Sequence, residues 1–365
     1  PPDAPVIYTI AAYTHEAIEW LSSERVLVIG TSATEHRLAP DEYVATDRLP
    51  LVSRMSAYGG AHAMPAFMGN LTVFIQTNGN QVRTFEQSGQ SVIEKWDSLE
   101  LDWKCKHLTF PKVKQLAYAL NPYSILMMVT LDGDLLTMTY EPNVGESSEV
   151  GWTKNVTDGS FISCAVIPED YKDQTWAIVE REIEGVNLKY VEYYDETIYS
   201  DSVLEYPDKD FPDDPPIQSV GGLEHLEGKT VTIKADGSTH PELVVVDGRV
   251  ELNDYYQHIQ IGLKYTPKIK LQRLAIAGEQ GNLQGMDGRW SEVWLRLVNS
   301  AYPLVDGIRA AERRPITPMD TVEPLVTADV KLYHLGWDTN KQLTITQDLP
   351  VPLHLTAIFG VVSVN

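Results

Sequence analysis

The sequence is poor in cysteine, in basic residues and in long apolar runs. Its 365 residues contain 2 Cys and 29 Lys+Arg against 51 Asp+Glu, a formal net charge of −22. Cys105 and Cys164 lack CxxC spacing, which excludes a disulfide scaffold and a Cys-ligated zinc site, so we expect buried free thiols and a reducing compartment. The shortage of basic charge argues against a sequence-specific DNA-binding protein, because phosphate neutralisation needs a basic face.

Motifs for catalysis and for membrane insertion are also lacking. No apolar run reaches the roughly 18 residues that a membrane helix needs, and the chain has no GxxxxGK[ST], no GxGxxG after a strand, no HExxH and no GxSxG. We therefore expect no catalytic residue, no metal site, no cofactor and no membrane-spanning segment. The start, Pro1-Pro2-Asp3-Ala4-Pro5, lacks an initiator Met and a signal-peptide pattern, which predicts a processed, truncated or internal piece.

Short β-strand patterns are present along most of the chain. Two apolar runs separated by Asn-Gly or Asp-Gly predict hairpins, as at Asn78-Gly79 and Asp132-Gly133. Because one hairpin cannot bury its apolar face alone, a repeat of about 50 residues predicts propeller-like blades, with a sandwich of irregular hairpins as the alternative. The first strands of the four predicted hairpins start at Val26, Leu71, Ile125 and Thr175.

An acidic, proline-rich segment divides the chain. Between Asp195 and Asp214, eight acidic residues stand against the single Lys209, a net charge of 1 − 8 = −7. Its prolines exclude a continuous helix or a central strand. We predict an all-β protein with a propeller-like domain over residues 1–204, a linker over residues 205–216, and a smaller antiparallel β-domain, a barrel or sandwich, over residues 217–365.

The C-terminal part has hairpin patterns of its own. We expect one hairpin around Asp236-Gly237 and a second that pairs residues 243–246 with residues 249–252 around Asp247-Gly248. Residues 268–276 are expected to form a strand, and residues 353–364 a strand pair. No segment of ten or more residues has a helical period with caps.

Two charged groups are candidates for lining a channel or an interface between subunits. Lysines that alternate along one strand face can meet DNA phosphates, meet the acidic loop of another subunit, or simply be solvated. Aromatic residues near Trp176 suit either the protein core or the stacking of sugars and bases. The candidate channel or interface residues are Asp195, Glu196, Asp208, Asp210, Asp213, Asp214, Lys268, Lys270 and Arg273.

The order of several short motifs resembles the tail nozzle proteins of short-tailed bacteriophages, also called tail tubular protein B or stabilisation-like proteins. The resemblance covers most of the chain from about Trp20 onward, and it is the order and spacing of the motifs together that make it specific. The central motif is Val220-Gly221-Gly222-Leu223-Glu224-His225-Leu226-Glu227-Gly228, followed by the turns Ala235-Asp236-Gly237 and Val246-Asp247-Gly248-Arg249-Val250. The other motifs are Gln115-Leu116-Ala117-Tyr118-Ala119, Ser163-Cys164-Ala165-Val166-Ile167-Pro168, Trp294-Leu295-Arg296-Leu297-Val298-Asn299-Ser300 and Gln347-Asp348-Leu349-Pro350-Val351-Pro352-Leu353.

The resemblance implies a structural virion protein without enzymatic activity. It implies a hexameric ring in the virion tail, assembled in the host cytoplasm, with genomic DNA passing non-specifically through its channel. The implied partners are other copies of the chain, a tail adaptor protein above the ring, and tail fibre, spike or needle proteins. Acidic charge suits a channel for DNA, because attractive contacts would slow a moving polyanion.

A propeller-type glycosidase or depolymerase of host surface polysaccharide is the alternative function. It requires a pocket in which two carboxylates face each other at a fixed gap. With 51 Asp and Glu residues in the chain, no pair stands out in the sequence.

Overall fold

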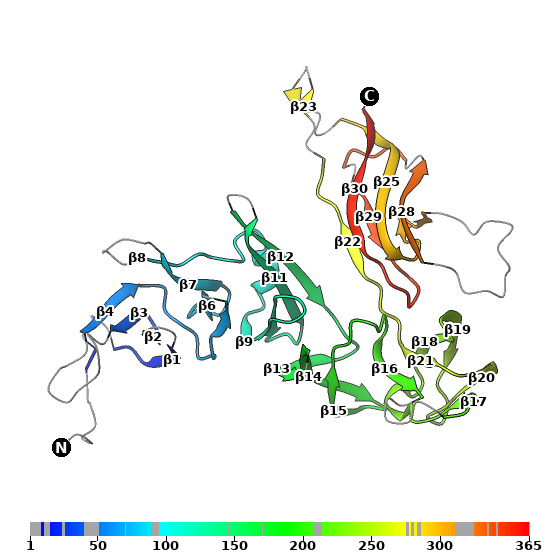
Figure 1. Cartoon of the computed structure of the whole chain (residues 1–365), viewed down its shortest axis with the longest axis horizontal. Helices are drawn as coiled ribbons and strands as arrows, with labels where there is room; N and C mark the ends of the chain where they lie inside the picture. Colours follow the sequence, from blue (N-terminus) through cyan, green and yellow to red (C-terminus); the bar gives the residue numbers. More distant parts are fainter. Residues whose placement is uncertain are drawn as a thin grey trace. The chain divides into compact units, whose positions relative to one another are not determined.

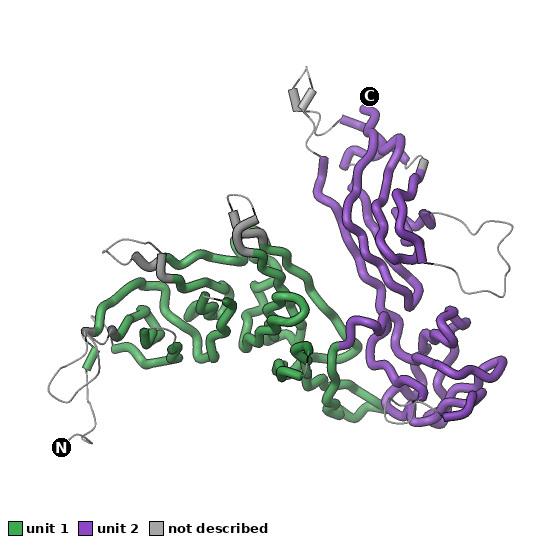
Figure 2. The backbone as a smooth tube through the Cα atoms, in the orientation of Figure 1, with its two compact units in different colours: residues 1–194 green, residues 195–365 purple. Residues whose placement is uncertain are grey.

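The chain forms two compact units, Pro1–Tyr194 (unit 1) and Asp195–Asn365 (unit 2), which Figure 2 colours separately. The boundary lies before the predicted domain end at residue 204. The structure is a computed structural model and describes residues 9–10, 15–23, 26–39, 51–69, 71–88, 95–144, 147–169, 171–207, 214–274, 277–278, 281–282, 286–310, 325–333, 336–340 and 342–364.

Unit 1 consists of four antiparallel sheets that follow one another along the chain (Figure 1). The strands of each sheet are joined in sequence order as a meander, with four strands in three sheets and three described strands in the last. The first two sheets are β1 (Ile18–Ser23), β2 (Leu27–Thr31), β3 (Glu35–Ala39) and β4 (Leu51–Ser56), then β5 (Ala66–Met68), β6 (Leu71–Ile75), β7 (Val82–Ser88) and β8 (Lys95–Asp97). The other two are β9 (Val113–Ala119), β10 (Ile125–Thr130), β11 (Leu135–Val144) and β12 (Ser147–Asn155), then β13 (Ser160–Glu169), β14 (Lys172–Ile183) and β15 (Val186–Tyr193).

Each sheet of unit 1 shares an apolar core with the sheet that follows it in the sequence. Trp20 and Val28 of the first sheet pack with Phe74 and Phe85 of the second, and the Trp20 and Phe74 ring centroids lie 5.2 Å apart. Residues of β6 and β10 form the core between the second and third sheets, and residues of β10, β11 and β13 form the next one. Each of the two middle sheets is therefore covered on both faces.

Strand β10 explains why a strand can be apolar without alternation. Leu126 and Met128 belong to the core shared with β6, whereas Met127 and Val129 belong to the core shared with Cys164 of β13. Since successive side chains point to opposite faces, a strand between two neighbours needs apolar residues at every position. The run from Ile125 to Val129 meets that need.

The predicted hairpins of unit 1 are confirmed. Strand β6 pairs with β7, β10 with β11, and β14 with β15, each in antiparallel register. The tight turn before β11 needs glycine, because Gly133 has a φ of 86° and a Cβ there would lie 2.6 Å from the Cβ of Ser160. The all-β class is confirmed, while closure of these sheets into a propeller stays a prediction.

The N-terminal part of unit 2 is built on one apolar core. Val231, Ile233 and Ile261 are fully buried in it, and Val220 and Val250 join it from a second, two-stranded sheet. The four-stranded sheet has the order β16 (Asp201–Tyr206), β21 (Ile259–Leu263), β18 (Thr230–Ala235) and β19 (Ser238–Val244), and the pair is β17 (Ile217–Val220) with β20 (Val250–Tyr256). Because β16 includes Glu205 and Tyr206, the start of the predicted linker is a paired strand.

One predicted hairpin in this region is wrong. Residues 243–246 and 249–252 approach each other only at the bridge between Val246 and Arg249, across a turn in which Asp247 and Gly248 have positive φ. On either side, β19 pairs with β18 and β20 pairs with β17. The turn thus carries the chain from one sheet to another over their shared core, which a local pattern cannot distinguish from a hairpin. The hairpin around Asp236-Gly237 is confirmed by β18 and β19.

The C-terminal part of unit 2 has two sheets over a second core. Val293 and Leu295 of the long strand β25 share that core with Val305 and Ile345 of the other sheet. The first sheet has the strand order β28 (Val326–Tyr333), β25 (Gly288–Ser300) and β30 (Leu355–Val364). The second has the order β22 (Lys268–Lys270), β29 (Thr344–Thr346), β26 (Leu304–Val305) and β27 (Ile308–Arg309). A separate pair is formed by β23 (Ala277–Gly278) and β24 (Gly281–Asn282). No closed barrel occurs among the described residues, and the predicted strand pair over residues 353–364 is the single strand β30.

Helix is rare in the described part of the chain. It is confined to α1 (Lys106–Thr109) and the 3-10 turn η1 (Glu224–Leu226). This agrees with the absence of helical periodicity in the sequence.

Candidate functional site

The predicted acidic candidates lie partly within the described residues. Asp195 Oδ1 accepts hydrogen bonds from the amide (2.9 Å) and the hydroxyl (2.6 Å) of Thr197, so its carboxylate organises a turn. Glu196 is exposed next to it, and the carbonyl of Asp214 accepts a hydrogen bond from Gln257 Nε2 at 2.7 Å. Asp208, Asp210 and Asp213 lie outside the described residues.

The predicted basic candidates are exposed in the C-terminal part of unit 2. Lys268 and Lys270 lie on β22, an edge strand that pairs with Thr346 and Thr344 of β29. Ile269 between them is 42% exposed. Arg273 follows the strand and is exposed as well. These side chains form a solvated row, which leaves a contact with DNA or another subunit as a prediction.

The aromatic residues around Trp176 do pack together. The rings of Trp176 on β14 and Tyr193 on β15 have centroids 5.4 Å apart in a tilted arrangement, on strands paired in that register. Ile178 and Val191 are cross-strand partners beside them, with 36% and 69% of their surfaces exposed. This cluster is a half-exposed apolar sheet face of unit 1.

A buried polar network that the sequence patterns did not predict occupies the first sheet. Glu16 accepts hydrogen bonds from the hydroxyls of Thr31 and Thr34, and Thr34 Oγ1 lies 2.7 Å from His36 Nε2. Burial lowers the pKa of His36. In the sequence, the signal for this network was the polar stretch that directly follows the apolar run of β2.

Glu35 is the most deeply buried carboxylate of this sheet, with no exposed surface. It accepts hydrogen bonds from Ser56 Oγ at 2.5 Å and from the Tyr58 amide at 3.2 Å. Burial raises its pKa, and these donors together with the charge of Arg83 oppose that rise. Both of these donors bind Oε2, whereas Oε1 is buried and has no hydrogen-bond partner among the described residues. The bonds to Oε2 hold β3 to the end of β4 and to the segment that follows it.

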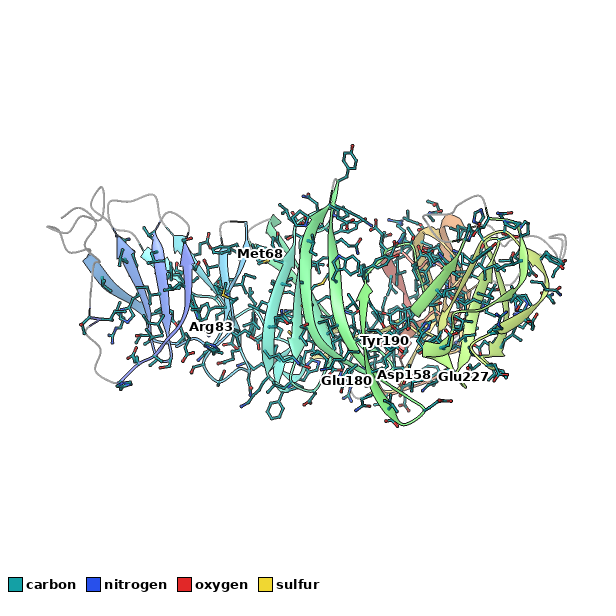
Figure 3. The ribbon with its side chains drawn as sticks, turned by 90° about the horizontal axis from the view of Figure 1, so that it is seen from below. Met68, Arg83, Asp158, Glu180, Tyr190 and Glu227 are labelled. Carbon is teal, nitrogen blue, oxygen red and sulfur yellow. The ribbon has the colours of Figure 1, made fainter. Side chains whose placement is uncertain are left out.

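Two arginines of unit 1 are also buried and hydrogen-bonded. Arg83, labelled in Figure 3, lies with Cζ 3.6 Å from the centroid of the Tyr58 ring and donates to Ser98 and Glu100. Arg181 donates to both carboxylate oxygens of Glu192, at 2.8 and 2.9 Å, and to the carbonyl of Asp158 at 2.9 Å. Such bidentate pairs fix geometry strongly.

A cavity of about 280 Å³ lies in the C-terminal part of unit 2. It is formed where the start of β25 meets the turn between β26 and β27 and the segment before β29. The polar and aromatic side chains around it come from Arg289, Trp290, Asp306, Trp337, Asp338 and Gln342. Sequence reasoning missed this site because its residues are far apart in the chain.

The cysteines and acidic residues do not form a reactive or metal-binding centre in the described structure. Burial raises the pKa of both thiols to about 11, with the Asp102 carboxylate adding to the effect at Cys105. Cys164 is buried and Cys105 is half-buried, and both are unpaired. Among the described residues, no group of three or more His, Cys, Asp or Glu side chains could hold a metal ion.

Comparison with known proteins does not identify the chain. No family model matches it, and no curated protein matches it. In the part of the chain that the structure describes, no helix has both the length and the apolar character needed to cross a membrane.

Proposed function

We propose that this chain is a structural subunit of a bacteriophage tail nozzle, arranged as a hexameric ring around a channel for genomic DNA. The observation that carries the proposal is the series of meanders in unit 1, whose consecutive sheets share cores in chain order. Stacked four-stranded meanders are the building plan of propeller-like domains, whose blades surround a central channel.

Two further features support a role in forming a channel through which DNA passes. The net charge of −22 disfavours attachment of a polyanion. The outer face of the last sheet, with Ile178 and Val191, is apolar and partly exposed, as expected for a surface that contacts another subunit. In the proposed virion tail, the partners are the adaptor protein above the ring and the fibre, spike or needle proteins.

The test is electron microscopy of the purified protein and of the assembled particle. We expect six-fold rings with a pore wide enough for duplex DNA, and six copies of the chain in each tail. A chain that stays monomeric in the particle would contradict the proposal. Cleavage of host polysaccharide by the purified protein would favour the glycosidase alternative.

A further inference from the structure

The cavity in unit 2 is held open by backbone hydrogen bonds. The amides and carbonyls of Gly288 and Asp338 form a bridge, with N–H···O distances of 3.2 and 2.8 Å, and this bridge fixes Trp337 beside the start of β25. Thr339 Oγ1 donates to Asp287 Oδ1 at 2.8 Å, which is a second attachment of the segment that contains Trp337. The site is therefore preorganised, which lowers the entropic cost of binding.

The Asp306 carboxylate is fixed on the other side of the cavity. The Asp306 amide donates to the Thr344 carbonyl at 2.8 Å, and its Oδ1 accepts from the Thr344 amide at 2.9 Å. One oxygen is thus used for positioning, and the residue itself is exposed. A carboxylate held in this way is ready to accept further hydrogen bonds.

Trp337 supplies an aromatic surface in this polar setting. Its side chain is 47% exposed, and the Cζ atom of Arg289 lies 5.1 Å from its ring centroid. Arg289 Nε is buried and has no hydrogen-bond partner among the described residues. An exposed indole beside a guanidinium group offers a ring face and hydrogen-bond donors to a ligand with oxygen acceptors.

The charges around the cavity discriminate between ligand classes. Asp306 and Asp338 oppose a phosphate, a nucleotide or a carboxylated ligand, whereas Arg289 beside the ring opposes a cation. A neutral ligand with many hydroxyls avoids both penalties, since carboxylates accept from hydroxyls and guanidinium groups donate to them. The volume of about 280 Å³ is small, which suits one or two rings.

We propose that this cavity binds a sugar unit of a neutral polysaccharide, with a ring face on Trp337 and hydroxyls bound by Asp306, Asp338, Gln342 and Arg289. The site lies within unit 2 and does not depend on ring assembly or on passage of DNA. It is a binding site, with no bond made or broken.

Binding of the full chain to soluble neutral tetrasaccharides of glucose, galactose, mannose and N-acetylglucosamine tests the proposal, with affinities measured by titration calorimetry. We expect at least one of them to bind, Trp337→Ala to weaken it by about tenfold or more, and Trp337→Phe to retain part of the affinity. The matched control is Trp103→Ala in unit 1, because Trp103 is 64% exposed and has Lys104 Nζ 5.1 Å from its ring centroid, yet lines no described cavity.

Several results would overturn the proposal. They are binding of none of the neutral tetrasaccharides, equal losses in the Trp337 and Trp103 variants, or binding of the corresponding phosphorylated sugars in preference to neutral ones. Hydrolysis of the bound tetrasaccharide would assign the cavity to a glycosidase instead. Retention of the wild-type thermal transition by Trp337→Phe separates a loss of binding from a loss of folding.

Discussion

Units 1 and 2 are both antiparallel β-structures, but they differ in what they bury. Unit 1 buries five ionisable side chains among its described residues: Glu35, His36, Arg83, Asp102 and Arg181. The described residues of unit 2 include no buried Asp, Glu, Lys, Arg or His, and its ion pairs, such as Arg296 with Asp329, lie at the surface.

The difference indicates two ways of specifying a β-fold. Unit 2 has large continuous apolar cores, which supply stability but accept many packings. Unit 1 has one apolar core of comparable size, between its second and third sheets, and smaller cores on either side of it. In addition it has buried charges, and a buried charge accepts only the arrangement that pairs it. We hypothesise that the buried charges of unit 1 select the arrangement of the strands and turns that pair them, and the predictions below test this.

The largest effect is expected at Arg181. Arg181→Met leaves Glu192 and the Asp158 carbonyl without their donor inside the fourth sheet, and should destabilise unit 1 by about 3 kcal/mol. Hydrogen exchange measured by mass spectrometry should show faster exchange in β13–β15 and unchanged exchange in β25.

Arg296→Met in unit 2 is the matched control. Arg296 also donates to both oxygens of its partner, Asp329, at 2.8 and 2.9 Å, but both side chains are largely exposed. The attraction raises the pKa of Arg296 and lowers that of Asp329. Exposed pairs contribute little to folding, so β25 should exchange as in the wild type. Equal losses in the two variants would show that burial does not cause the difference between the units.

A smaller effect is expected at Asp102. This buried carboxylate accepts hydrogen bonds from the Val82 amide at 3.1 Å and from Thr109 Oγ1 at 2.7 Å. Asp102→Ala leaves two buried donors unpaired and should lower the free energy of unfolding of unit 1 by about 2–3 kcal/mol, measured with urea.

The corresponding variant in unit 2 is Ser300→Ala. Ser300 Oγ accepts from the His354 amide at 2.6 Å and donates to the Val298 carbonyl at 2.8 Å, so a neutral buried group is lost. The expected cost is about 1 kcal/mol. A cost at Ser300 as large as that at Asp102 would contradict a special role for buried charge.

The smallest effect, and one of opposite sign, is expected at Glu35. Because burial raises its folded pKa above the ordinary value of 4.5, its favourable contribution is present below that value and is lost as the pH rises through the folded pKa. Glu35→Gln should therefore stabilise unit 1 at pH 8, by on the order of 1 kcal/mol. The gain should vanish near pH 4, as measured by urea unfolding across this range. Destabilisation at pH 8 would show that the ionised carboxylate is needed for pairing.

The sequence was sufficient for features that depend on neighbouring residues. Asn78-Gly79 and Asp132-Gly133 mark confirmed hairpins, because glycine supplies the positive φ that Gly79 and Gly133 adopt in these turns. The same rule failed at Asp247-Gly248, where a turn with positive φ at both residues joins two different sheets. Turn chemistry determines the turn, and the distribution of buried apolar residues determines which strand each arm pairs with.

The candidate sites depended on contacts between distant residues and were mostly beyond prediction. Charge runs directed attention to residues 195–214 and to Lys268 and Lys270. Where described, these residues lie in a turn, in the half-buried strand β16 or at exposed positions of β22. The cavity combines Arg289 with Trp337, two residues that share no motif and meet through the bridge between Gly288 and Asp338. Buried Arg181 resembled any other strand residue, because its partner Glu192 is on the next strand.

The sharing of cores between consecutive sheets of unit 1 also has a consequence for cooperativity. Each sheet is stabilised by its immediate neighbours, so the unit behaves as a short linear array in which an end sheet has one interface and a middle sheet has two. Opening should begin at the ends and reach β10 last, since β10 contributes to both of its sheet's cores. The most persistent structure of the unit is then its centre, and an exchange-labelling experiment should find the last amides to exchange in β10.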